Sequence, residues 1–188
     1  MTVKKAKLWT MKQVQDELSE VARLGEIFLD GDLCRKLWQP YAEKFMCGDD
    51  MDYNPEAGVP VKKTLFRLER AGHLPCSTAL WRRRADYPES GEALLYGSHA
   101  SPYDTDKPKM RGYVPPKMTP EMESVFLRGE RATTVNMSYG RAAMMAGRGL
   151  AVRVRGVKRP TAVQVFTPVK DSMGEIAAAL EVFTMAVS

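Results

Sequence analysis

The segment TAVQVFTPVKDSMGEIAAALEVFT, residues 161–184, decides the fold that the sequence predicts. It contains two largely apolar runs, Thr161–Pro168 and Glu175–Thr184, separated by a short polar stretch. Asp171 can accept hydrogen bonds from nearby amides and Gly174 can adopt a positive φ, which is typical of a tight turn. The two runs are therefore predicted to be the strands of one antiparallel hairpin.

The second run also has helical character. Met173–Val187 is rich in Ala, Glu, Leu and Met, and these residues favour a helix. We prefer a strand because the run follows a β-type segment through a short turn.

A third strand is predicted just upstream, at Gly149–Arg155. Its apolar residues occupy every second position: Leu150, Val152 and Val154. This period of two is that of a strand with one buried face. The same alternation places Arg153 on the opposite, outer face.

Length and composition predict a single domain covering 1–188, with a helical part at 10–72 and a sheet part at 76–184. The 188 residues are 44% hydrophobic and 27% charged, as in ordinary globular proteins. No apolar run approaches about 18 residues, so no membrane segment is expected. The basic start lacks the apolar stretch of a signal peptide. The chain as it stands is expected to be cytoplasmic, or extracytoplasmic if it is an excised receptor domain.

The first predicted helix is Met11–Leu29. Thr10 and Gln13 form the T-x-x-Q pattern of a capping box, which satisfies amides of the first turn. Apolar residues then recur at steps of three and four: Met11, Val14, Leu18, Val21 and Leu24. This stripe either packs on the protein's own sheet or pairs with a partner helix in a homodimer.

Further helices are expected before the sheet. Asp32 can cap a second helix that Pro40 kinks or splits. Gly48–Pro60 has the composition of a loop, and its acidic cluster lacks the spacing of a calcium-binding loop. A third helix is predicted at Val61–Ala71.

The second half of the chain completes a mainly antiparallel sheet. Strands at Cys76–Arg84 and Glu92–Ser98 form a hairpin. A long connection follows, then a helix from Thr119 to Gly129, with proline at its first position. Arg131–Met137 is a further strand. The predicted fold class is α+β, with an antiparallel sheet of about five strands, a long N-terminal helix and flanking helices.

This order of elements resembles the PAS-like sensor domains, particularly the Cache type of bacterial receptors. The matching stretches are Leu29–Leu33, Thr64–Arg70, Ser77–Arg84, Glu92–Gly97, and Val163–Ile176 leading into Ala179–Phe183. The last of these is similar to the P-V-x-D-x-x-G-x-[VI]-x-x-x-L-E-V ending that such domains share. The resemblance implies a pocket between the sheet and a covering segment, and a ligand signal that reaches the terminal helix. The spacing of the family's amino-acid-binding residues is not matched, so none of their roles is carried over.

No constellation in the sequence indicates catalysis. The G-x-S-x-G elbow of serine hydrolases and the lysine of a phosphate-binding loop are both missing from the sequence. Cys34, Cys47 and Cys76 have no metal-ligand spacing and are expected to be structural thiols. The chain is therefore expected to have no catalytic activity and no metal site. The sequence does not identify a cofactor.

A ligand site is predicted on the sheet and the segment that covers it. Trp81 and Tyr96 can supply flat apolar walls, and arginines can grip a carboxylate or phosphate. The residues assigned to the site are Trp81, Arg83, Tyr96, Tyr139, Arg141 and Gln164. The alternative for Trp81 is a core position, and the alternative for the arginines is a solvent-facing position.

The expected function is that of a small-molecule-binding sensory domain, with an anion among the candidate ligands and a homodimer through Met11–Leu29. Two alternatives stay open. Trp81–Arg84 can bind single-stranded nucleic acid by base stacking and phosphate contacts, which suits the formal net charge of +5. This partner is the less favoured one, because the basic residues are spread along the chain. The other alternative is a structural dimerisation module.

Overall fold

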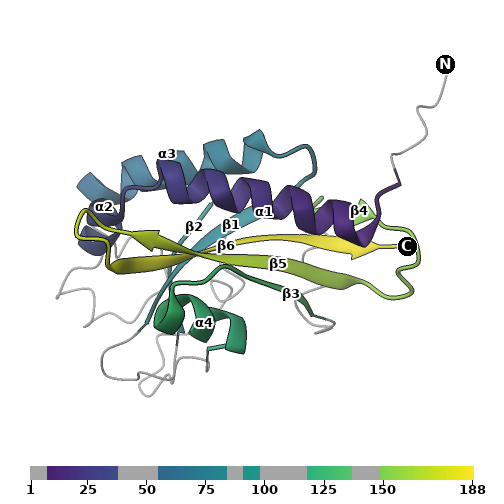
Figure 1. Cartoon of the computed structure of the whole chain (residues 1–188). Coiled ribbons are helices and arrows are strands. Elements are labelled where there is room, and N and C mark those ends of the chain that lie inside the picture. The colour runs from purple at the N-terminus through teal and green to yellow at the C-terminus, as the bar shows by residue number, and fades with distance from the viewer. Residues whose placement is uncertain (1–7, 38–54, 84–90, 98–117, 137–148) are drawn as a thin grey trace, which may run out of the picture.

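The protein has an α+β fold, seen in a computed structural model that describes residues 8–37, 55–83, 91–97, 118–136 and 149–188. Helices pack against both faces of one sheet (Figure 1). The helices are α1 (Met11–Phe28), α2 (Gly31–Lys36), α3 (Pro55–Ala71) and α4 (Pro120–Arg128). The strands are β1 (Ser77–Arg83), β2 (Gly91–Tyr96), β3 (Ala132–Asn136), β4 (Ala151–Arg153), β5 (Thr161–Lys170) and β6 (Ile176–Val187).

The sheet has the strand order β2-β1-β6-β5-β3, and every neighbouring pair in this order is antiparallel. The short strand β4 lies off this path and pairs with the end of β6 in parallel. The predicted α+β class with a five-stranded antiparallel sheet is confirmed. This arrangement is compatible with a PAS-like fold.

The hairpin predicted from residues 161–184 is present as β5 and β6. Its register runs from Thr161 opposite Ala186 to Lys170 opposite Ile176. The residues after Met173 are thus strand rather than helix. β6 has a hydrogen-bonded neighbour on each side, and these pairings override the helix propensity of its alanines.

One face of the sheet is covered by α1 and α3 (Figure 1). The stripe of α1 packs here: Val14, Leu18 and Val21 are at most 1% exposed and belong to one core with sheet residues such as Leu180. The expected capping box is present, with the Gln13 amide donating to Thr10 Oγ1 at 3.2 Å. Of the two interpretations of this stripe, packing on the protein's own sheet is confirmed.

The other face of the sheet carries α4. Met122 and Val125 of this helix pack against Trp81 and Phe166 of the sheet. The helix has the ends that the sequence predicts, a Thr119 cap and a left-handed glycine at position 129. The sheet therefore buries side chains on both faces.

The predicted starts of two helices were wrong. The cap of α2 is Asp30, whose Oδ1 accepts from the Leu33 amide at 3.0 Å, and not Asp32. Helix α3 begins at Pro55, so the last residues of the predicted loop Gly48–Pro60 are helical. Ala57 is buried, and its burial favours the longer helix. The expected kink at Pro40 and the acidic cluster of the loop lie outside the described residues.

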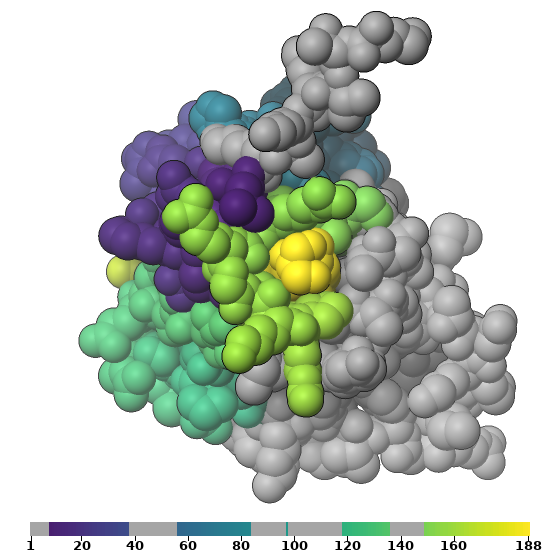
Figure 2. All heavy atoms as spheres, turned by 90° about the vertical axis from the view of Figure 1, so that its right-hand side faces the viewer, coloured from purple at the N-terminus to yellow at the C-terminus, as the bar shows by residue number. Residues whose placement is uncertain are grey.

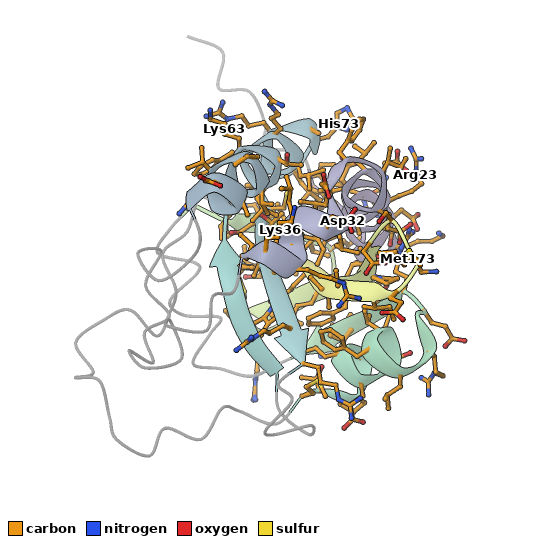
Figure 3. The ribbon with its side chains drawn as sticks, turned by 90° about the vertical axis from the view of Figure 1, so that its left-hand side faces the viewer. Arg23, Asp32, Lys36, Lys63, His73 and Met173 are labelled. Atoms are coloured by element: carbon orange, nitrogen blue, oxygen red, sulfur yellow. The ribbon has the colours of Figure 1, made fainter. Side chains whose placement is uncertain are left out.

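Asp32 instead joins α2 to the β5–β6 turn, which lie side by side in Figure 3. Its Oδ1 accepts from the Ser172 amide at 3.3 Å and from the Ser172 hydroxyl at 3.2 Å. Arg35 adds ion pairs to Asp171 and Glu175. We call this set of contacts, from Asp32 and Arg35 to residues 171–175, the α2–turn clamp.

At the opposite end of the molecule, the first described residues are joined to β4 (Figure 2). The Trp9 amide donates to the Arg153 carbonyl at 2.9 Å, and the Arg155 amide donates to the Trp9 carbonyl at 2.8 Å. The last residues of β6, yellow in Figure 2, lie among the light-green residues that follow position 149. Among the described helices, none is both long and apolar enough to cross a membrane.

The α2–turn clamp depends on Gly31. A Cβ at this position would lie 2.2 Å from the Lys170 carbonyl oxygen and 2.6 Å from the Asp171 nitrogen, both backbone atoms. We expect Gly31→Ala to destabilise the protein by about 1–3 kcal/mol, because the backbone must move. Helix propensity alone would give the opposite sign, since alanine exceeds glycine by about 1 kcal/mol. Urea denaturation measures the change, with the exposed Lys36→Ala of the same helix as the control. A Gly31→Ala protein as stable as the wild type would contradict the close packing.

Candidate functional site

The structure separates the residues that the sequence assigns to one site. Trp81 and Gln164 are buried on the α4 side of the sheet, whereas Arg83 is exposed at the end of β1. Tyr96 belongs to β2, but its side chain is not among those described. Tyr139 and Arg141 lie outside the described residues. Arg153 is exposed on β4, on the outer face that the alternation predicts.

Trp81 and Gln164 converge on the carboxylate of Glu181, a residue that the sequence-based prediction of the site does not include. The Trp81 Nε1 donates to Glu181 Oε2 at 2.8 Å, and the Gln164 Nε2 donates to Glu181 Oε1 at 2.5 Å. Glu181 is 0% exposed. A buried carboxylate is costly unless its oxygens accept hydrogen bonds, and here each oxygen accepts at least one.

This carboxylate cluster is part of the core. Trp81 is 6% exposed, so its ring is not presented on the surface. The core alternative for this tryptophan is confirmed. A sequence signal for the cluster exists in β6, where Glu181 is the one charged residue of a mostly apolar strand and stands between Leu180 and Val182. Glutamate in the interior of a central strand indicates a buried partner.

Arg83 lines a different feature, a cleft with a volume of about 330 Å³. The described residues around this cleft come from α2, β1, α4 and β6: Cys34, Arg35, Arg82, Arg83, Phe126, Ile176 and Ala177. We call it the arginine cleft. Figure 3 looks onto the end of the molecule where these elements meet.

The position of the arginine cleft follows from the strand register. The pairing of β1 with β6 reaches Trp81 opposite Ala179 and goes no further. The next residues of β1, Arg82 and Arg83, and the first two residues of β6 line the cleft instead. The cleft therefore begins where the hydrogen bonds between the two strands stop.

Arg35 brings a third guanidinium to the cleft from α2. Its Nε donates to Asp171 Oδ2 at 2.5 Å, and its Nη2 donates to Glu175 Oε2 at 3.2 Å. The Asp171 side chain is 6% exposed, whereas that of Glu175 is 76% exposed. A guanidinium suits carboxylates and phosphates because it offers several donors in one plane.

The acidic partner of Arg35 has a shifted pKa. Burial by itself raises the pKa of Asp171, but the Glu175 amide, Arg35 and the Met173 amide outweigh it. The pKa of Asp171 therefore lies below its ordinary value of 3.8. Asp171 is ionised at neutral pH and holds Arg35 beside the cleft.

Cys34 contributes a thiol to the cleft but no nucleophile. Burial and the neighbouring Asp30 raise the pKa of Cys34 to about 12. Burial, Glu69 and Glu17 raise the pKa of Cys76 likewise to about 12. Both thiols are buried and free of disulfides, as expected of structural cysteines. They are protonated at neutral pH, when a thiolate would be needed for attack.

The described part of the chain contains no cluster of His, Cys, Asp and Glu suited to a metal ion. Comparison with protein-family models, with curated proteins and with solved structures found no match to this chain.

The carboxylate cluster can be tested by removing its acceptor. We expect Glu181→Ala to lower the free energy of unfolding by about 2–5 kcal/mol, because the Trp81 and Gln164 donors lose a buried partner. Glu181→Gln keeps one carbonyl acceptor, so its free energy of unfolding should fall by less. Urea denaturation of both variants, beside the exposed Glu123→Ala, measures the difference. Equal stability of Glu181→Ala and the wild type would show that the cluster does not stabilise the fold.

The pKa of Asp171 gives the α2–turn clamp a pH dependence. A pKa that folding lowers adds stability above the ordinary value of 3.8, and this contribution disappears as the pH falls through the lower value in the folded protein. We expect Asp171→Asn to be less stable than the wild type at pH 6 and the difference to shrink below about pH 4. Urea denaturation across this range checks it, with the exposed Asp16→Asn as the control. A difference that stays constant down to about pH 2 would be contrary to this account.

Proposed function

We propose that this chain is a small-molecule-binding domain of the PAS-like sensory type, without catalytic activity, and that its ligand is an anion bound in the arginine cleft. The single observation that carries the proposal is the presence of Arg35, Arg82 and Arg83 around one cleft. Paired guanidinium donors are the common means of holding a carboxylate or phosphate.

The fold supports this proposal in a general way. An α+β domain with a five-stranded antiparallel sheet suits a PAS-like sensor. The volume of the cleft, about 330 Å³, is at the lower end of the range for small-molecule sites. The site differs from the one expected under the covering segment, because Trp81 and Gln164 bind Glu181 instead.

A route for a signal leads from the cleft to the N-terminal helix. Arg35 belongs to α2, which follows α1 after only Leu29 and Asp30. Asp30 caps α2, and Leu29 donates its amide to the Gly25 carbonyl at the end of α1. A ligand that shifts Arg35 would therefore act close to the end of α1.

The homodimer through Met11–Leu29 stays a prediction. The apolar stripe of α1 is buried inside the protein, so a partner would have to use other residues of the helix. Ile27 and Phe28 are 59% and 63% exposed and would be available for such a contact.

Ligand binding can be measured with inorganic phosphate and benzoate as probes. We expect both anions to raise the melting temperature and to shift NMR signals of residues around the cleft. Arg83→Gln should weaken binding by about 10-fold or more, since one charge-assisted hydrogen bond is worth about 1.5–3 kcal/mol. The exposed Arg153→Gln, at the other end of the sheet, should leave the affinity unchanged.

Other outcomes would identify a different function. Failure of both anions to bind, or equal weakening by Arg83→Gln and Arg153→Gln, would rule out the arginine cleft as an anion site. Salt-dependent retention of single-stranded oligonucleotides, with no effect of small anions, would favour the nucleic-acid alternative. The burial of Trp81 weighs against that alternative, because base stacking needs an exposed ring.

A further inference from the structure

The arginine cleft is chemically divided. Among its described lining residues, we call Arg35, Arg82 and Arg83 the cationic side and Phe126, Ile176 and Ala177 the apolar side. These apolar residues are only partly buried. A purely charged ligand would not cover the apolar residues of the cleft, and a purely apolar ligand would not bind its arginines.

The cationic side already binds carboxylates. Arg35 Nε binds Asp171, and Arg35 Nη2 binds Glu175 at 3.2 Å. Asp171 is held in the turn, where its Oδ1 accepts from the Met173 and Glu175 amides. The Glu175 side chain has its contact with Arg35 on the surface and is 76% exposed. Exposed ion pairs contribute little stability, so the contact with Glu175 is the one that another carboxylate can replace.

The apolar side is contributed by α4 and β6. Phe126 packs on the cluster that contains Trp81 and Phe166, and it reaches the cleft from the α4 side of the sheet. Burying apolar surface of a ligand against such residues is favourable in proportion to the area removed from water. Binding should therefore grow stronger as the ligand's apolar part grows.

We propose that the arginine cleft binds an organic carboxylate with an apolar body. The carboxylate takes the place of Glu175 at Arg35, and the apolar body lies against Phe126 and Ile176. This inference rests on the proposed function, because it specifies the class of anion that the same cleft takes. It also assigns Glu175 a role in affinity, as a tethered carboxylate that competes with every carboxylate ligand.

The experiment compares acetate, butanoate and benzoate at pH 7, where all three carry one negative charge. Dissociation constants come from NMR titration of the full chain. We expect benzoate to bind at least about 10-fold more tightly than acetate, with butanoate between them. Because this series uses the wild-type protein, it does not depend on the folding of any variant.

Two variants test the contacts of the ligand's carboxylate and of its apolar body separately. Glu175→Gln should tighten acetate and benzoate by the same factor, about 3-fold or more, since it removes a competitor and leaves the apolar side intact. Phe126→Leu should reduce the ratio between benzoate and acetate. The matched controls are Glu130→Gln, an exposed glutamate paired with Arg128, and Leu127→Ala, an exposed neighbour of Phe126.

The outcomes distinguish the inference from the proposed function. If acetate and benzoate bind equally, or Glu175→Gln leaves both affinities unchanged, the inference is wrong while the cleft still binds anions. If no carboxylate binds but inorganic phosphate does, the carboxylate class is wrong and the proposed function stands. If neither phosphate nor any carboxylate binds, both are wrong.

Discussion

The central position of β6 is the constraint on which the rest of the structure depends. This strand pairs with β1 on one side, β5 on the other and β4 at its end. Its alternating residues enter two different cores: Leu180 and Val182 face α1 and α3, whereas Ala179 packs on the α4 side. A shift of β6 by one residue would exchange these two sets. The Glu181 carboxylate would then point toward α1 and α3, away from Trp81 and Gln164.

The same register creates the candidate site. Pairing between β1 and β6 ends at Trp81 and Ala179, and residues beyond this pair on both strands line the cleft. The α2–turn clamp then supplies Arg35 from a distant part of the sequence and fixes it through Asp171. The buried carboxylate cluster and the arginine cleft thus occupy neighbouring positions along β1, one closed and one open.

Much of the fold follows from local sequence chemistry. The turn at Asp171 and Gly174, the capping box at Thr10 and the Thr119 cap are all short-range signals, and each is present in the structure. The start of α3 was missed because proline and glycine near it have loop composition, whereas the burial of Ala57 depends on tertiary packing. The sequence pattern predicts a capping role for Asp32. Its actual partner is Ser172, and a contact with so distant a residue cannot be predicted from the local sequence.

The candidate site was harder to predict from the sequence, because it also depends on contacts between distant residues. The sequence predicts that Arg83 belongs to a site. Arg35 is 48 positions away, and only the docking of α2 on the turn brings it to the same cleft.

The most direct test of the account is a crystal structure of the protein with benzoate. We expect the carboxylate on Arg35 and Arg83, the ring against Phe126, and Glu175 displaced. Benzoate bound elsewhere, with Glu175 still on Arg35, would contradict the account.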